Sequence, residues 1–447
     1  MLPLPTVLEP LVLSLCAAFT EPTFNRFAAL CVGAILTRGR RTVTGMLHGA
    51  GGMAPGHFSD YHRVFSRARW SLWPLGKALA TMVLRLVPDG EPVLVPIDDT
   101  TAQHKGKCVY GKGCHHDAVR STHTHVVWRW GHRWVVAAIS VALPFTSRRW
   151  ALPVLAVLYR PEELNRAEKR RHKTPPCLAR QMMAVLILWF RSRRFVFLGD
   201  GGYASHELAS FCSRHARHAT LISRFHGDAN LYAPPTTRKR TGRPPLKGAK
   251  LPTPAQTVAR SKRIRATVSW YGGQTRRVEL VSGTGLWYKS GEGVVPVRWV
   301  HVHDIQGTHR DDYVYSTDLS LSPAQIVSWF TARWPIETTF QEVRAHLGFE
   351  TPRQRVAKSV LRTAPCLLGL FSLIAVAYAE HLRRHQPKVA RTAWYHKTEP
   401  TFADALNAIR RLLWTELLSA RGHIADVFQK LPPPYRRMVL DNLCSAA

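Results

Sequence analysis

The sequence predicts an α/β fold, with a mixed β-sheet core, a β-rich insertion, and helical regions at both ends. Two continuous apolar runs, residues 93–97 and 195–199, are typical of strands that are buried on both faces. Helical periodicity fills residues 1–90 and 350–447, whereas residues 263–316 alternate between apolar and polar side chains, as strands do. The central sheet is therefore expected between two helical ends.

Residues 1–90 are expected to form short helices that are joined by basic turns. A helix is predicted through Leu36 and another over residues 57–69. The turn between them carries Arg38, Arg40 and Arg41. Such an arrangement resembles helix-turn-helix DNA readers, although a plain helical bundle with a basic surface fits this segment equally well.

The segment from 91 to 226 has the order of elements of a ribonuclease H-like core. We expect a strand at 93–97, a hairpin of two strands around Gly131, and then alternating helices and strands. The predicted elements after the first strand are strands 123–130 and 133–143, helix 175–190, strand 195–199, helix 206–217 and strand 220–225. Ligands gather at the carboxyl ends of strands in open α/β sheets, so this core predicts where a site would lie.

A long interruption follows before the core resumes. Its start, residues 234–245, is rich in Pro and Arg and is expected to be a linker. The strands predicted after the linker are 263–270, 274–282, 286–289, 294–303 and 312–316. The domain boundaries predicted from this pattern are 1–90 (helical, DNA-binding), 91–226 (core, first part), 227–320 (β-rich insertion), 321–349 (core helix with the third acid, capped by Ser322-Pro323) and 350–447 (C-terminal helices).

Charge limits the class of partner. Lys and Arg number 62 against 29 Asp and Glu, which gives the 447-residue chain a formal charge of +33, spread along its whole length. This charge favours a polyanion partner, most simply DNA or RNA, and predicts salt-sensitive binding. The eight cysteines show no C-x-x-C spacing, and Cys108 and Cys114-His115-His116 fit no common zinc motif, so we expect reduced, intracellular thiols. The longest apolar run, 364–379, is too short to span a bilayer and is expected to be a core helix, so no membrane partner is predicted.

Few acidic residues remain against this charge, and three stand at informative places. Asp98, with Asp99 beside it, ends the first buried strand, Asp200 ends the second, and Glu337 lies on a later predicted helix with Arg333 and Arg344 on the same face. Each alone has a simpler explanation as a turn residue or a solvated charge. Together they match a site for two divalent cations, which needs hard oxygen ligands from separate elements. The predicted catalytic and metal-binding residues are Asp98, Asp200 and Glu337.

At this point the chain resembles a known family, the cut-and-paste DDE transposases of bacterial insertion sequences, in the branch with a β-domain inserted before the glutamate. Phe330, Arg333, Glu337 and Arg344 stand at the spacing of that family's signature around the third acid. The segments 97–101 and 198–203 are similar to its motifs around the first two acids. Two residues depart from the family pattern, since Phe330 replaces Tyr and Arg344 replaces Lys, and they leave open whether a hairpin-forming step is retained. Either Asp98 or Asp99 fits as the first acid, and we favour Asp98.

The resemblance implies a transposase that binds terminal inverted repeats, cleaves at the ends of its element and joins them to target DNA with Mg²⁺, for which Mn²⁺ could substitute. It implies double-stranded DNA as partner, a homodimer on DNA, and a bacterial cytoplasmic, nucleoid-associated location. The DNA-binding residues expected are Arg333, Arg344, Arg40 and Arg41. A non-catalytic DNA-binding descendant and a ribonuclease H-like nuclease stay open as alternatives.

Overall fold

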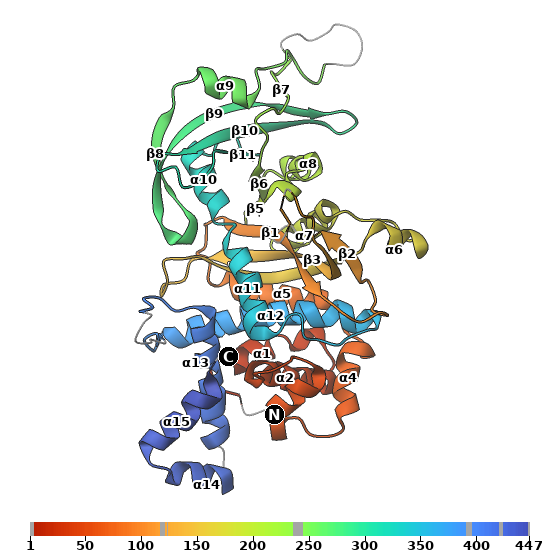
Figure 1. Cartoon of the computed structure of the whole chain (residues 1–447), viewed down its shortest axis with the longest axis vertical. Helices are drawn as coiled ribbons and strands as arrows, with labels where there is room; N and C mark the ends of the chain where they lie inside the picture. The colour runs from red at the N-terminus through yellow and green to blue at the C-terminus, as the bar shows by residue number, and fades with distance from the viewer. Residues whose placement is uncertain are drawn as a thin grey trace.

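The computed structural model of the protein describes residues 4–116, 121–122, 124–235, 245–389, 396–419 and 423–445. A large mixed sheet crosses the molecule, and helices from both ends of the chain gather at one side of it (Figure 1). Most of the predicted Pro/Arg-rich linker, residues 236–244, lies outside the described residues.

The elements follow one another along the chain as three groups. The N-terminal helices are α1 Glu9–Leu13, η1 Cys16–Ala18, α2 Glu21–Leu36, α3 Val43–Ala50, η2 Gly51–Met53, α4 Phe58–Ser66 and α5 Leu72–Leu84. The central elements are β1 Val93–Gln103, β2 Gly113–His116, β3 Trp128–Val141, β4 Trp150–Tyr159, α6 Glu162–Ala167, α7 Pro175–Trp189, β5 Phe195–Gly199, η3 Gly201–Tyr203, α8 His206–Arg214, β6 Ala219–Arg224, β7 Leu231–Tyr232, α9 Pro254–Arg260, β8 Ile264–Ser269, η4 Tyr271–Gly273, β9 Thr275–Lys289, β10 Gly293–Asp304 and β11 Asp312–Ser316. The remaining helices are α10 Pro323–Thr331, α11 Pro335–Leu347, α12 Ala357–Leu382, α13 Phe402–Ser419, α14 His423–Lys430 and α15 Pro433–Cys444.

The described strands form a single sheet in the order β2-β3-β1-β5-β6-β11-β10-β9-β7, with β4 on β3 and β8 on β9. Strands β1, β5 and β6 run parallel to one another, and β3 and β11 join them antiparallel on either side. The inserted strands therefore continue the core sheet through β11, which pairs with β6. The mixed α/β class expected from the sequence is confirmed.

Two apolar clusters hold the fold together. The larger contains side chains from both faces of β3 and joins the N-terminal helices, α7, α8 and the C-terminal helices α12 and α13, so these regions share one core. The smaller lies where α10 covers strands from both the core and the insertion, and it contains the buried ring of Phe330. Because residues 1–90 contribute to the larger core, they cannot be removed without exposing it.

The predicted hairpin around Gly131 is wrong. Strand β3 passes straight through Gly131, which pairs with Gln103 on β1 and with Gly113 on β2. The hairpin partner of β3 is instead β4, which the sequence analysis missed. Pro153 made that strand hard to recognise, because proline removes a ladder hydrogen bond; it lies next to an irregularity in the pairing register, where proline is tolerated.

Helix α12 is, in the described part of the chain, the one helix long and apolar enough to cross a membrane by length and composition alone. However, 72% of its most apolar window is buried inside the protein. It packs against β4, α5 and α13. This burial is that of a core helix.

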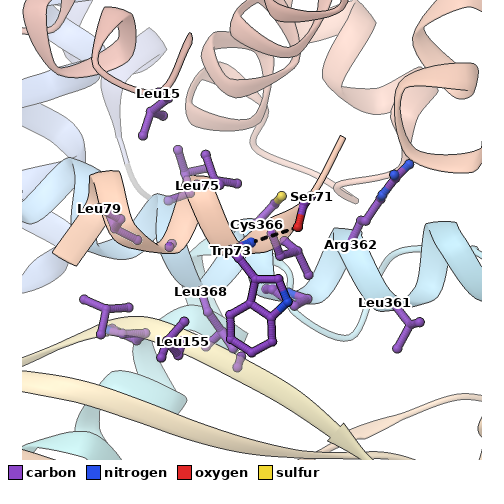
Figure 2. Close-up of a pocket in the computed structure, with 18 of the residues that line it drawn as sticks. Leu15, Ser71, Trp73, Leu75, Leu79, Leu155, Leu361, Arg362, Cys366 and Leu368 are labelled. Carbon is purple, nitrogen blue, oxygen red and sulfur yellow. Dashed lines mark hydrogen bonds between the residues drawn. The ribbon is translucent and has the colours of Figure 1, made fainter. Parts of the chain in front are cut away.

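An apolar cavity lies between α5, β4 and α12 (Figure 2). It is a cavity of about 370 Å³ with mostly Leu, Trp and Val around it. The Arg362 guanidinium at its rim donates to the carbonyls of Phe65 and Trp70. Burial raises the pKa of the Cys31 thiol in its wall to about 12, so that thiol stays protonated. With no carboxylate in its lining, the cavity is unsuited to metal-assisted phosphoryl transfer.

The position of Gly131 within β3 predicts a sharp steric requirement. A Cβ on Gly131 would lie 2.1 Å from the Ala102 carbonyl oxygen, so Gly131→Ala must displace backbone. We expect this substitution to lower the free energy of unfolding by roughly 2 kcal/mol. Gly52→Ala is the matched control, because a Cβ there meets nothing within 4 Å. Thermal or denaturant unfolding of both variants measures the difference, and equal stability would contradict the close approach of β1 and β3.

Candidate active site

The parallel pairing of β1 with β5 brings the first two predicted acids together. Ile97 pairs with Gly199 at the end of this ladder, so Asp98 and Asp200 are the next residues on neighbouring strands. Neighbouring strands lie about 4.8 Å apart. Two buried apolar runs thus deliver two carboxylates to the same edge of the parallel segment.

Asp98 lies in a poorly solvated place, with 15% of its side chain exposed. Burial raises the pKa of its carboxyl to about 7, and the charges of Asp200 and Asp99 act in the same direction. Arg333 and the Asp99 backbone N–H, which donates to Asp98 Oδ1 over 2.8 Å, oppose this rise. The surroundings of Asp98 thus concentrate negative charge that a cation would relieve.

Asp99 has a different environment, although it is adjacent in sequence. Arg133 on β3 donates to both of its oxygens, over 2.6 and 2.8 Å, and the Tyr203 hydroxyl donates to Oδ1 over 3.2 Å. Both carboxylate oxygens therefore already have a strong partner. Asp98 also accepts on both oxygens, but it has a single bond from Arg333, which divides its donors between Asp98 and Glu337. The preference for Asp98 over Asp99 stays a prediction.

Asp200 is oriented by the glycine turn that follows it. Its Oδ1 accepts from the Gly202 N–H over 2.9 Å, and its backbone carbonyl accepts from the Ser223 hydroxyl. A Cβ on Gly199 would lie 2.7 Å from the Tyr203 Cβ, so the strand end needs glycine to let Tyr203 pack beneath it. The Asp-Gly-Gly sequence thus fixes the orientation of the Asp200 carboxylate.

Glu337 joins these residues through Arg333. The Arg333 guanidinium donates to Asp98 Oδ2 over 3.1 Å and to Glu337 Oε1 over 3.0 Å. Only 10% of the Arg333 side chain is exposed, whereas Glu337 is 41% exposed. The three acids predicted from the sequence therefore lie in one region, with a cation between the first and the third.

The single helix expected around Glu337 is divided in two. Helix α10 ends at Thr331, α11 begins at Pro335, and Arg333 lies in the turn between them. Pro335 explains the break, since a proline lacks the N–H that a continuous helix would need but suits a first helical turn. Ser322 accordingly caps α10. Arg333 lies outside both helices, yet it contacts Glu337 four residues on, as expected from the sequence.

The other predicted cations have unlike environments. Arg344 on α11 donates to the Thr100 hydroxyl and to the Thr101 carbonyl, so it lies against β1 beyond Asp98. Arg40 is exposed in the turn before α3. Arg41 is only 3% exposed, and its guanidinium donates to the carbonyls of Gly39 and His346, each over 2.6 Å. In this conformation Arg41 cannot reach a phosphate, and the expectation that it binds DNA is corrected to a structural role.

The inserted strands also reach the site, which the sequence analysis missed. The Tyr271 ring packs against Trp334. Burial raises the pKa of the Tyr271 hydroxyl, while the charge of Arg333 lowers it and that of Glu337 raises it. His309 stacks on Tyr271 with ring centroids 5.5 Å apart. Tyr271 follows β8, whereas His309 lies in the β10–β11 connection, so no spacing in the sequence predicts the pair.

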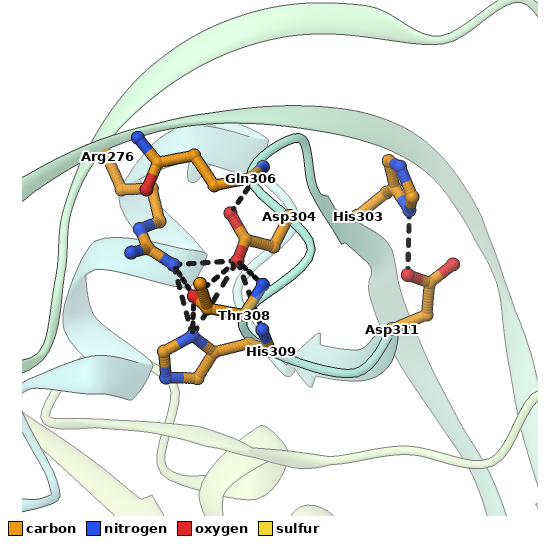
Figure 3. A network of polar contacts seen from close by, with 7 residues as sticks. All are labelled: Arg276, His303, Asp304, Gln306, Thr308, His309 and Asp311. Atoms are coloured by element: carbon orange, nitrogen blue, oxygen red, sulfur yellow. Dashed lines mark hydrogen bonds and ion pairs between the residues drawn. The ribbon is translucent and has the colours of Figure 1, made fainter.

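A buried carboxylate fixes the loop that carries His309 (Figure 3). Asp304 is 2% exposed and accepts from the N–H groups of Thr308 and His309 and from Arg276. Nearby, Asp311 accepts from His303 over 2.8 Å. These bonds fix the β10–β11 connection and so position His309 against Tyr271, which in turn contacts Trp334.

The donors present suit a divalent cation chemically, although Arg333 now lies between two of them. Within the described ranges, no three His, Cys, Asp or Glu side chains converge closely enough to form an ion site as they stand. All three acids nevertheless offer hard oxygen ligands, as Mg²⁺ and Mn²⁺ prefer, and Asp98 needs a positive neighbour. Rotation of the Arg333 side chain would open the space between Asp98 and Glu337.

Comparisons with known proteins point in one direction. The family model described as DDE superfamily endonuclease matches residues 14–277, which is more than half of the chain and includes Asp98 and Asp200. A search of curated proteins finds no match. Among solved structures, the chain is similar to that of the piggyBac transposase synaptic complex with hairpin DNA, with a TM-score of 0.38 and 10% identity over 98% of this chain and 81% of the other. So distant a likeness carries no argument about activity.

The neighbouring residues Arg40 and Arg41 predict opposite effects. Arg41→Ala should lower the free energy of unfolding by about 2 kcal/mol, because buried carbonyls lose their donor. Arg40→Ala should leave stability within about 0.5 kcal/mol, yet weaken binding to duplex DNA and reduce its salt dependence by about one phosphate contact. Thermal unfolding and fluorescence anisotropy at several salt concentrations measure the two effects. Unchanged DNA binding by Arg40→Ala would remove this turn from the DNA path.

The bridging position of Arg333 predicts a link between stability and metal. Arg333→Ala should lower stability by about 2 kcal/mol without divalent ions, because Asp98 and Glu337 lose their shared cation. Millimolar Mn²⁺ should then raise the melting temperature of the variant more than that of the unmodified protein. Arg166→Ala, which removes an exposed pair with Glu162 at the same i,i+4 spacing, is the control and should change little. If Mn²⁺ raised the melting temperature of the unmodified protein, Arg333→Ala and Arg166→Ala equally, Arg333 and the metal ion would not occupy the same site.

Proposed function

Because the chain belongs to the DDE superfamily endonucleases, we propose that it is a transposase that binds the terminal inverted repeats of a DNA element, cleaves at its ends and joins them to target DNA. The observation that supports this proposal is that Asp98 and Asp200 follow the paired ends of β1 and β5, while Arg333 links Asp98 to Glu337. These acids come from elements more than 100 residues apart in sequence, so only the fold unites them.

Enzymes of the DDE superfamily use divalent metal ions, and in this chain Asp98, Asp200 and Glu337 would hold them, as Mg²⁺ or Mn²⁺. Bound there, such ions would activate the attacking oxygen and stabilise the leaving oxygen of an in-line displacement. Asp98 must give up its proton to serve as a ligand. Once released from the two carboxylates, Arg333 would hold a phosphate on one side of the reacting bond. Arg344 lies beside Thr100 of β1 and would hold a phosphate on the other side.

Phosphate binding across a wider surface follows from the charge of the chain. A formal charge of +33 supports long contacts with duplex DNA, with affinity that falls steeply as salt rises. The exposed Arg38 and Arg40 in the turn before α3 would extend the grip from the N-terminal helices. Since those helices share the main core, point substitutions test this role and a deletion does not.

A dimer on DNA is part of the proposal. One active site with three acids acts on one end of a DNA element, so cleavage at two ends requires two protomers. The positive charge opposes self-association until DNA neutralises it, and the free protein is expected to remain monomeric. Sedimentation with and without DNA that carries the terminal repeat measures this difference.

The catalytic assignment predicts a separation of cleavage from binding. Asp98→Asn, Asp200→Asn and Glu337→Gln should each lower Mg²⁺-dependent cleavage of DNA carrying the element ends at least a thousandfold, while binding changes less than about threefold. Asp99→Asn should chiefly lower stability, because it breaks the pair with Arg133. Asp89→Asn is the control, since that carboxylate is fully exposed and pairs with Arg193 at the surface.

The same assay separates the alternatives. Cleavage without joining would indicate a nuclease, and specific binding without metal-dependent cleavage by the unmodified protein would indicate a non-catalytic DNA-binding protein. Full activity of Asp200→Asn would exclude the proposed site.

A further inference from the structure

Two tryptophans stand out on the surface at the start of β3. Trp128 is 61% exposed and Trp130 is 58% exposed, more than any other tryptophan in the described ranges. Exposing two large indoles costs apolar burial, and the described residues around them leave both rings more than half exposed. An exposed pair of this kind is typical of an interaction site.

The strand register places these rings on the same sheet face as Asp98. Asp98 pairs with Val136, and paired residues point to the same face. Alternation along β3 then assigns Trp130 and Trp128 to that face too. Val136 and Trp130 are six residues apart, which is about 20 Å along the strand.

The spacing of the two rings suits nucleobases. Residues i and i+2 on one strand face are about 6.7 Å apart. This distance is about twice the 3.4 Å rise between stacked bases, so one base fits between the two indoles. The indoles are also held in place, since His116 on β2 meets Trp128 edge-on, with ring centroids 5.8 Å apart.

Positive charge surrounds the rings. The Lys112 ammonium lies 5.3 Å from the centroid of the Trp130 ring. Burial, followed by the charges of Arg353 and Lys112, lowers the pKa of His104, whose backbone N–H donates to the Trp130 carbonyl. Further exposed cations on adjoining segments are Lys105, Lys107 and Arg353. Exposed aromatic faces among cations are typical of surfaces that bind single-stranded nucleic acid.

We propose that Trp128 and Trp130 form a stacking platform for unpaired nucleotides of DNA, with Lys112 and its neighbouring cations on the phosphates. Unpaired bases present the flat faces that the indoles need, whereas the bases of an intact duplex are stacked on each other. The link to the reacting phosphate rests on the proposed function. The binding itself needs neither metal nor cleavage, and so it is tested separately.

The test compares single-stranded with duplex binding in EDTA. Fluorescence anisotropy with a labelled 20-nucleotide strand, and with the duplex of the same sequence, would be measured for the full chain, the double variant Trp128→Ala/Trp130→Ala, and Trp128→Phe/Trp130→Phe. We expect the alanine variant to lose at least about tenfold in affinity for the single strand and less than twofold for the duplex. The phenylalanine variant should recover most of the loss, because it keeps a ring.

A control and a second signal keep the result specific. Trp73→Ala removes another exposed indole, on α5, and should leave both affinities unchanged. A 2-aminopurine base in the strand should be quenched by the unmodified protein and not by the alanine variant. The proposal would be overturned if the alanine variant bound the single strand as tightly as the unmodified protein, or lost as much affinity for the duplex as for the single strand. It would also be overturned if the alanine substitutions changed the sedimentation of the DNA-free protein, because this face would then bind a second copy of the chain.

Discussion

The parallel pairing of β1 with β5 is the constraint on which the site depends. Its ladder ends with Ile97 opposite Gly199, and a shift of one residue would turn one of the two following aspartates to the opposite face of the sheet. Buried Val and Phe side chains fix the register, because any slip would expose them. The position of the carboxylates is therefore secured by apolar packing several residues away.

The sequence was informative where burial and chemistry coincide. The apolar runs before Asp98 and Asp200 predicted both strands and the convergence of the two acids, because a short continuous apolar run is typical of a strand buried on both faces. It was less informative about connections. Strand β4 carries Pro153 and was missed, and Gly131 looked like a turn although it serves a close approach of backbones. The Tyr271–His309 pair depends on long-range packing that no local pattern encodes.

Charge could be counted from the sequence but not located. Arg41, Arg362 and Arg410 are all buried, and each donates to several backbone carbonyls from distant segments. Burial lowers the pKa of Arg41 and of Arg410 to about 10, yet both remain charged at neutral pH. These guanidiniums hold separate segments together by hydrogen bonds to backbone carbonyls. Part of the formal charge of +33 therefore stabilises the fold.

The pairing of β11 with β6 also bears on solubility. Strand β6 is the last parallel strand of the core, and without β11 its backbone N–H and C=O groups would form an open sheet edge. Open edges recruit strands from other molecules and lead to aggregation. The inserted strands therefore act as a seal on the core. A version of this chain without the inserted strands would need another protection for the β6 edge, such as a charged residue or a bulge, to stay soluble.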